Sequence, residues 1–177
     1  MGCAVDTNLI EATISFHGHS CPGLAIGIRA AELAMEKLEI QKTANSLCVT
    51  ETDMCGVDAI QFLTGCSFGK GNLVHKDFGK SAFTFFNRDT SQGFRALFLD
   101  NGPQQEDRTA RIRQIMAADL EDIFEVQKID APPVRPARIL KSIVCDKCKE
   151  MTMESRIRLF GGEQLCMPCF KAVEQKI

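Results

Sequence analysis

The sequence predicts an α+β protein, in which an antiparallel sheet with packed helices is followed by a small C-terminal zinc ribbon. Amphipathic segments in the first 40 residues predict helices, and β-prone segments between residues 46 and 99 predict the sheet. Two Cys-x-x-Cys pairs after residue 144 predict the ribbon. At 177 residues, the chain holds one ordinary core and a small appendage.

The composition narrows the range of functions. The chain is 45% hydrophobic and 25% charged with a formal net charge of −2, so no global field favours nucleic acid as a partner. No apolar run reaches the roughly 18 residues of a membrane span, and no signal-peptide pattern opens the sequence. Nine cysteines without an export signal indicate metal and thiol chemistry in a reducing cytoplasm, where we expect the protein to act.

Two helices are predicted before residue 40. The first covers residues 5–16 and ends at Gly18, and the second follows Ser20, which we expect to be its N-cap, with a proline in its first turn. The second helix has an apolar stripe formed by Leu24, Ile28, Ala31, Met35 and Leu38. Gly23 and Gly27 leave room for close packing against another element.

Four short segments are predicted strands of an antiparallel meander. They cover residues 46–50, 73–75, 82–86 and 94–99. His75, the third histidine of the chain, lies at a strand end, where a lone histidine is more often structural than functional.

The longest predicted helix covers residues 105–127 and carries an apolar stripe with a seven-residue period. This stripe suits packing on a second protomer and packing on the core equally well. Three prolines follow within nine residues, so an extended linker is expected. The predicted organisation is an α+β domain over residues 1–130, a linker over 131–138 and a ribbon over 139–177.

Two segments of the first domain concentrate reactive side chains. The segment Phe-His-Gly-His-Ser-Cys-Pro-Gly at 16–23 holds His17, His19 and Cys21 just before a predicted helix. The segment 51–65 places Cys55 at the start of another short helix. A cysteine at a helix N-terminus meets free N–H groups and a positive dipole end, which favour the thiolate.

These residues support two interpretations. Cys21, Cys55 and one histidine would give a zinc, iron or molybdenum/tungsten species three protein ligands and an open position. Without a metal, the two cysteines would form a redox dithiol whose pKa a histidine lowers. The candidate catalytic residues are His17, His19, Cys21, Cys55, Asp53 and Asp58, the first four of which also form the candidate second metal site. The two aspartates would orient or titrate beside the others, although Asp53 also suits a helix cap and Asp58 a helix-dipole role.

The glycine-rich segment 66–73 resembles a phosphate-binding loop only loosely, because it lacks the Gly-x-x-x-x-Gly-Lys-Ser/Thr order. A flexible loop that closes over a site is the preferred interpretation. Its Lys70 would then contact an anionic ligand.

The C-terminal segment carries the strongest metal-binding pattern of the chain. Cys145-x-x-Cys148 is followed after seventeen residues by Cys166-x-x-Cys169, a spacing typical of tetrahedral zinc. The intervening residues 155–162 predict a hairpin. Because so short a segment has almost no core, zinc is expected to supply most of its folding free energy.

The partner of the ribbon is not specified by its charge. Residues 139–177 hold seven Lys or Arg against five Asp or Glu, a net charge of +2 that favours nucleic acid only weakly. Contact with DNA, a partner protein or the other protomer is therefore the alternative to a purely structural ribbon.

The motifs together resemble the FmdE family of molybdenum (tungsten) formylmethanofuran dehydrogenase. The resemblance is carried by Phe-His-Gly-His-x-Cys-Pro-Gly at 16–23 and Thr-Asp-x-Cys-x-x-Asp-Ala-Ile-Gln at 52–61. The Gly-rich loop, the Lys-Asp-Phe-Gly-Lys-Ser-Ala-Phe stretch at 76–83, the proline linker and the four-cysteine ribbon extend it over essentially the whole chain.

The resemblance implies an α+β domain with a His/Cys cleft, an intertwined homodimer and zinc in the ribbon. It also implies association with other chains of a molybdenum or tungsten oxidoreductase related to methanogenesis. The pterin–metal machinery of that enzyme is assigned to those other chains, so catalysis by this chain alone is not implied.

Overall fold

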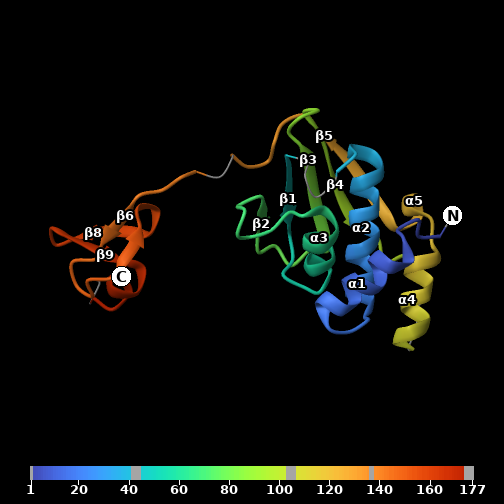
Figure 1. Cartoon of the computed structure of the whole chain (residues 1–177), viewed down its shortest axis with the longest axis horizontal. Helices are drawn as coiled ribbons and strands as arrows, with labels where there is room; N and C mark the ends of the chain where they lie inside the picture. The colour runs from blue at the N-terminus through green and yellow to red at the C-terminus, as the bar shows by residue number, and fades with distance from the viewer. Residues whose placement is uncertain (1, 41–44, 103–106, 136–137, 174–177) are drawn as a thin grey trace. The chain divides into compact units, whose positions relative to one another are not determined.

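The computed structural model describes residues 2–40, 45–102, 107–135 and 138–173 (Figure 1). The chain divides into two compact units, Met1–Ala137 and Arg138–Ile177. Parts of the predicted 105–127 helix, the linker at 136–137 and Lys176 lie outside the described residues. No helix in the described ranges is long and apolar enough to cross a membrane.

The first unit is an α+β domain, as predicted. Its helices are α1 (Thr7–His17), α2 (Pro22–Leu38), α3 (Gly56–Thr64), α4 (Arg108–Ala117) and α5 (Leu120–Ile123). Its strands are β1 (Ser46–Thr50), β2 (Leu73–His75), β3 (Ala82–Asn87), β4 (Gln92–Phe98) and β5 (Phe124–Ile129). They form one sheet in the order β2-β1-β3-β4-β5, antiparallel except for the parallel pair β1–β2.

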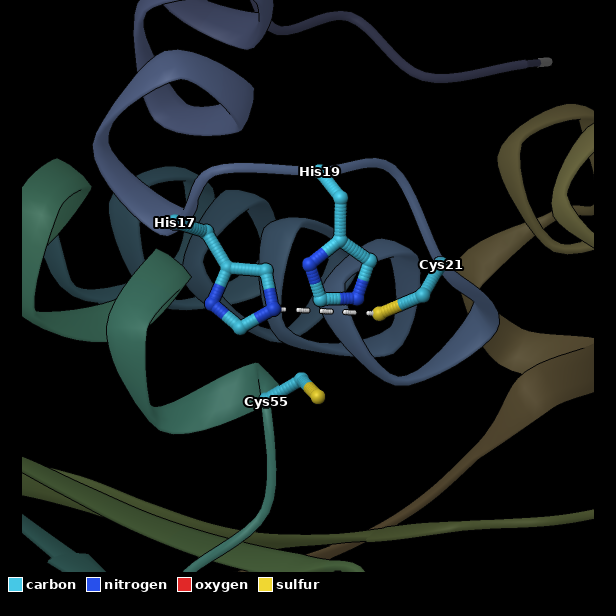
Figure 2. A group of neighbouring side chains, drawn as sticks. All are labelled: His17, His19, Cys21 and Cys55. Carbon is cyan, nitrogen blue, oxygen red and sulfur yellow. Dashed lines mark hydrogen bonds between the residues drawn. The ribbon is translucent and has the colours of Figure 1, made fainter.

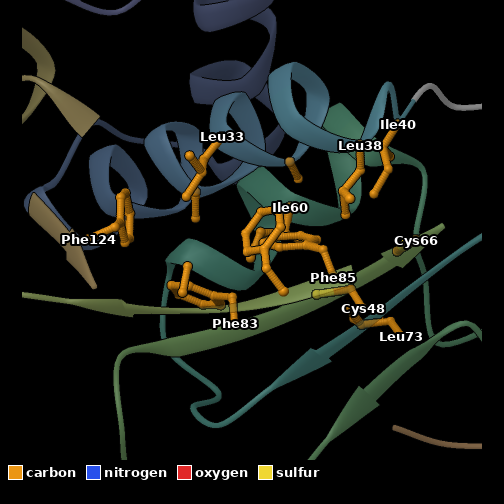
Figure 3. Packing of buried hydrophobic residues seen from close by; sticks show 14 of the residues in the cluster. Leu33, Leu38, Ile40, Cys48, Ile60, Cys66, Leu73, Phe83, Phe85 and Phe124 are labelled. Atoms are coloured by element: carbon orange, nitrogen blue, oxygen red, sulfur yellow. The ribbon is translucent and has the colours of Figure 1, made fainter. Parts of the chain in front are cut away.

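The main core lies between the sheet and the helices α2 and α3 (Figure 3). Phe83 and Phe85 of β3 project toward Leu33 of α2 and Ile60 of α3, and all four side chains are at most 2% exposed. Burying side chains of this size contributes about 1.5–3 kcal/mol each. The core therefore fixes both helices on one face of the sheet.

Two glycines allow α2 and α3 to approach backbone to backbone. A Cβ atom at Gly27 would overlap the backbone of Gly56, and a Cβ atom at Gly23 would lie 3.4 Å from the Cβ atom of Cys55. The room that these glycines were predicted to leave is thus occupied by the start of α3. The contact brings Cys55 beside the N-terminal end of α2.

The predicted helix 105–127 is wrong beyond residue 123. The helix α4 ends at Ala117, α5 adds one turn, and the chain then enters β5, which pairs with β4 in the register Ala96↔Val126. The break is stabilised from a distance, because the fully buried Arg29 donates its Nη2 hydrogen bond to the carbonyl of Ala118 at 2.5 Å. Arg29 also pairs with Glu32 at 2.8 Å.

The second unit consists of two hairpins and a short helix. The hairpin β6–β7 joins Ser142–Val144 to Met151–Met153, and η1 (Glu154–Arg156) precedes the hairpin of β8 (Ile157–Phe160) and β9 (Glu163–Cys166). Gly161 and Gly162 turn the second hairpin with positive φ angles of 58° and 86°. The helix α6 covers Met167–Lys171. Its core contains little besides cysteines, Leu165 and the partly buried Phe170 and Val173.

Candidate metal sites

Four side chains of the first unit converge at the ends of three helices (Figure 2). One ligand atom from each of His17, His19, Cys21 and Cys55 lies within 4.8 Å of all the others. His17 is the last residue of α1, Cys21 directly precedes α2 and Cys55 directly precedes α3. The structure thus brings together four of the six candidate residues of this domain, and Cys55 is 34 or more positions from its three partners in the sequence.

Cys21 starts α2, which corrects the expectation for Ser20. The N-cap is Cys21, whose Sγ atom accepts a hydrogen bond from the backbone N–H of Leu24 at 3.3 Å, and Pro22 follows as the first helical residue. Ser20 is exposed. Sulfur is a weak acceptor but sits where a serine oxygen would normally act, and this position fixes the buried Cys21 side chain next to His17.

The imidazole of His17 is held by Asp58. Its Nδ1 atom lies 2.7 Å from Oδ2 of Asp58, and its Nε2 atom lies 4.0 Å from Sγ of Cys21. Asp58 is in the first turn of α3, and its second oxygen lies 3.5 Å from the amide of Gln61. With the proton on Nδ1 bound by the carboxylate, the lone pair of Nε2 is directed toward the group, as in carboxylate–histidine–metal arrangements.

The two thiols of the group disfavour each other's ionisation. Burial and the neighbouring Cys21 thiol raise the pKa of Cys55 above its ordinary value, and the charge of Asp58 adds to the rise. The thiolate expected for Cys55 from its helix N-terminus is therefore not favoured in the protein alone, because desolvation and the adjacent groups outweigh the helix dipole. A bound cation would reverse this balance, since metal binding displaces thiol protons.

The remaining candidates lie apart from the group. Asp53 is exposed, and α3 begins at Cys55 without a side-chain cap, so the predicted capping by Asp53 is wrong. Lys70 is exposed and donates to the carbonyl of Gly65 at 2.9 Å. It lines a shallow hollow of about 320 Å³ with Phe16 and Phe62, one helical turn beyond Asp58.

The second unit assembles the four ribbon cysteines. The Sγ atoms of Cys145, Cys148, Cys166 and Cys169 lie within 4.8 Å of one another, and those of Cys148 and Cys166 are 3.8 Å apart. This separation equals the edge of about 3.8 Å expected for a tetrahedron with zinc–sulfur bonds near 2.3 Å. Hydrogen bonds from the backbone N–H groups of Cys166 and Cys148 lower the pKa of Cys145 to about 6, which prepares one thiolate. The Cys166 thiol and burial raise the pKa of Cys169 to about 12.

Comparison with known proteins agrees with both clusters. Residues 16–130 match the family model described as FmdE, molybdenum formylmethanofuran dehydrogenase operon. The chain belongs to the FmdE family. In this member of the FmdE family, residues 138–175 also match the prokaryotic dksA/traR C4-type zinc finger. The second unit is therefore a zinc-binding cysteine cluster, as the spacing predicted.

Two relatives extend the FmdE assignment. The crystal structure of an FmdE-like protein of tungsten formylmethanofuran dehydrogenase from Syntrophus aciditrophicus shares the fold, with a TM-score of 0.74 and 24% identity. The similarity covers 99% of this chain and 100% of that one. A probable S-adenosyl-L-methionine-binding protein from Archaeoglobus fulgidus is 27% identical over 92% of this chain. The chain spans only 52% of that protein's length.

Proposed function

We propose that the first unit binds a divalent transition-metal ion through His17, His19, Cys21 and Cys55. The proposal rests on one observation, the convergence of two imidazoles and two thiols within 4.8 Å with His17 oriented by Asp58. The 4.0 Å between Cys21 and His17 is within a few tenths of an ångström of the edge of about 3.6 Å that zinc ligands would span. These residues therefore fit the ion.

The donor set indicates zinc or iron. Cys21 and Cys55 would supply two thiolates, whose charges balance a divalent cation, and the imidazoles would supply nitrogen donors that both metals accept. A bound zinc ion acts as a Lewis acid, and a bound iron ion adds a redox centre. Asp58 would hold the His17 ring in one orientation and keep its Nε2 atom unprotonated.

We further propose that the metal site serves an accessory or redox role in one-carbon or molybdenum/tungsten metabolism. Membership of the FmdE family, whose description refers to a molybdenum enzyme operon, supports this assignment. In this role the chain acts as a homodimer or beside other chains of a molybdenum or tungsten enzyme. The name of the Archaeoglobus relative concerns a protein of about twice this length, and it adds no ligand to the proposal.

Metal content per chain tests the site. The wild-type protein is expected to hold about two ions, one in each cysteine cluster. Cys21→Ser/Cys55→Ser is expected to keep the ribbon ion alone, and Cys148→Ser/Cys169→Ser is expected to keep the other. Cys3→Ser is the matched control, because Cys3 belongs to neither cluster. A wild-type protein with one ion, lost with the ribbon cysteines, would contradict the proposal.

The same variants test the redox alternative. If Cys21 and Cys55 act as a dithiol, the metal-free protein should form a reversible disulfide between them, detected by mass spectrometry of the alkylated protein. The raised pKa of Cys55 favours the metal-bound form over this alternative, because a protonated thiol attacks disulfides slowly.

An exposed apolar hairpin in the ribbon favours a second role in protein contact. The side chains of Val144, Met151 and Met153 are 47%, 65% and 55% exposed. Strand pairing places Val144 opposite Met151 and Ser142 opposite Met153, so these residues share one face. We propose that this face contacts a partner protein or the other protomer. Met151→Glu/Met153→Glu should lower the sedimentation coefficient of any assembly, whereas Thr152→Glu on the opposite face should not.

A further inference from the structure

The two histidines of the metal site differ in how firmly they are held. His17 ends α1, its side chain is only 10% exposed, and its Nδ1 atom is bound to Asp58. Rotation of this ring would break a charge-assisted hydrogen bond at 2.7 Å. The Nε2 atom of His17 is thus preorganised as a ligand.

His19 has no comparable support. Its side chain is exposed, and among the described residues its imidazole makes no hydrogen bond. Its ring contact is with His17 itself, at a centroid separation of 4.5 Å and an interplanar angle of 38°. Figure 2 shows the His19 ring on the connection between α1 and α2, outside both helices.

The backbone around His19 allows the side chain to leave. Gly18 ends α1 with a φ angle of +93°, and a Cβ atom there would meet nothing within 4 Å. The regular geometry resumes only at Cys21, which is fixed as the N-cap of α2. The short stretch between them can therefore turn without disturbing His17 or the two cysteines.

From these differences we infer that His19 is the exchangeable ligand of the site. His17, Cys21 and Cys55 hold the ion, and an external small molecule with a thiolate, carboxylate or imidazole donor takes the position of His19. The two thiolates already balance the charge of a divalent cation, so a neutral or singly charged donor suits the fourth position. Entry comes from solvent on the His19 side, since the other three ligands are buried or half-buried. This inference rests on the proposed metal site.

Cobalt(II) titration of the full-length protein tests the inference. Zinc stays in the ribbon because cobalt binds such sites less tightly, so added cobalt reports the first unit through its ligand-field and thiolate charge-transfer bands. His19→Ala should weaken cobalt binding by about tenfold or less, whereas His17→Ala should weaken it by at least about 100-fold. Imidazole added to the His19→Ala protein should restore the wild-type band pattern. His75→Gln is the matched control, because His75 lies outside the group.

Each outcome separates the inference from the proposed function. If His19→Ala loses cobalt as completely as His17→Ala, both histidines are resident ligands and the inference fails while the metal site stands. If only His19→Ala loses cobalt, the roles are reversed and the inference fails. If His19→Ala keeps cobalt but imidazole leaves the spectrum unchanged, no external ligand enters and the inference fails. If the wild-type protein gives no cobalt bands, the metal site itself is wrong.

Discussion

The Nδ1 atom of His17 lies 2.7 Å from the Oδ2 atom of Asp58, although the two residues are 41 positions apart in the sequence. The contact joins the last residue of α1 to the first turn of α3. It therefore links the orientation of a candidate ligand to the helix that also positions Cys55. Both halves of the site depend on the same two helix ends.

Replacing Asp58 should weaken the metal site without removing a ligand. Asp58→Asn leaves a side chain of the same size but no carboxylate, so the metal affinity of the first unit should fall about 10–100-fold. Asp53→Asn is the control, because Asp53 is an exposed acid in the same segment. Competition with a chromophoric chelator measures both variants. Equal affinities for the two proteins would show that the His17–Asp58 contact does not act on the ion.

Gly27→Ala should separate the two helices that carry the cysteines. The added methyl group would overlap the backbone of Gly56, which cannot rotate away as a side chain can. We expect a loss of about 1–3 kcal/mol in the free energy of unfolding of the first unit. Metal content should fall as well, since Cys55 directly precedes Gly56.

The control for this substitution is Gly69→Ala, where a Cβ atom would meet nothing within 4 Å. Urea unfolding followed by circular dichroism compares the two variants. A Gly27→Ala protein as stable as the Gly69→Ala protein would contradict the close helix contact.

Removal of zinc should unfold the ribbon and leave the first unit folded. The ribbon has almost no apolar core besides Leu165, Phe170 and Val173, so the bonds to zinc must replace it. Cys148→Ser should lose the ribbon ion and become cleavable by protease within residues 138–173. The first unit should keep its unfolding midpoint, because it forms a separate compact body. A protease-resistant ribbon in the metal-free protein would show that zinc is dispensable there.

The ion pair of Glu51 and Arg95 should give the first unit a defined acid sensitivity. Two hydrogen bonds of 2.6 and 2.8 Å join the side chains, and the Arg95 guanidinium lowers the pKa of Glu51. Because the folded-state pKa lies below the unfolded value, the stabilisation is complete above the unfolded pKa of about 4.5. It is lost as the pH falls through the lower, folded-state pKa.

Glu51→Gln should therefore destabilise the protein by about 1–3 kcal/mol at pH 7, with a difference from wild type that shrinks below about pH 4.5. Glu11→Gln, at an exposed position on α1, serves as the control. Urea unfolding at several pH values measures the difference. A difference that stays constant from pH 7 to pH 3 would rule out this linkage.

Elements with strong local patterns were predictable from the sequence. The ends of α1 and α3 follow from Gly18 and Gly65, which adopt positive φ angles of 93° and 72°. The ribbon cluster follows from cysteine spacing alone. Chemically unusual residues at two predicted helix starts also indicated that Cys21 and Cys55 belong together.

Features that depend on distant contacts were not predictable in the same way. The end of α4 depends on a hydrogen bond from Arg29 across 89 positions, and the apolar periodicity around it continues a helical pattern. The alternation of Phe124 and Val126 with polar residues is a period-two signal that could have identified β5. The assignment of Asp58 to His17 required the packing of α1 on α3, which no local pattern contains.

Two sulfur atoms of the candidate ligands also serve the backbone. Sγ of Cys21 accepts from the N–H of Leu24, and Sγ of Cys145 accepts from the N–H of Cys166, both at 3.3 Å. Alkylation or oxidation of either sulfur would therefore remove a backbone acceptor as well as a ligand. Hydrogen–deuterium exchange should quicken first at these two amides, and fraying of α2 from its first turn would mark chemical damage to Cys21.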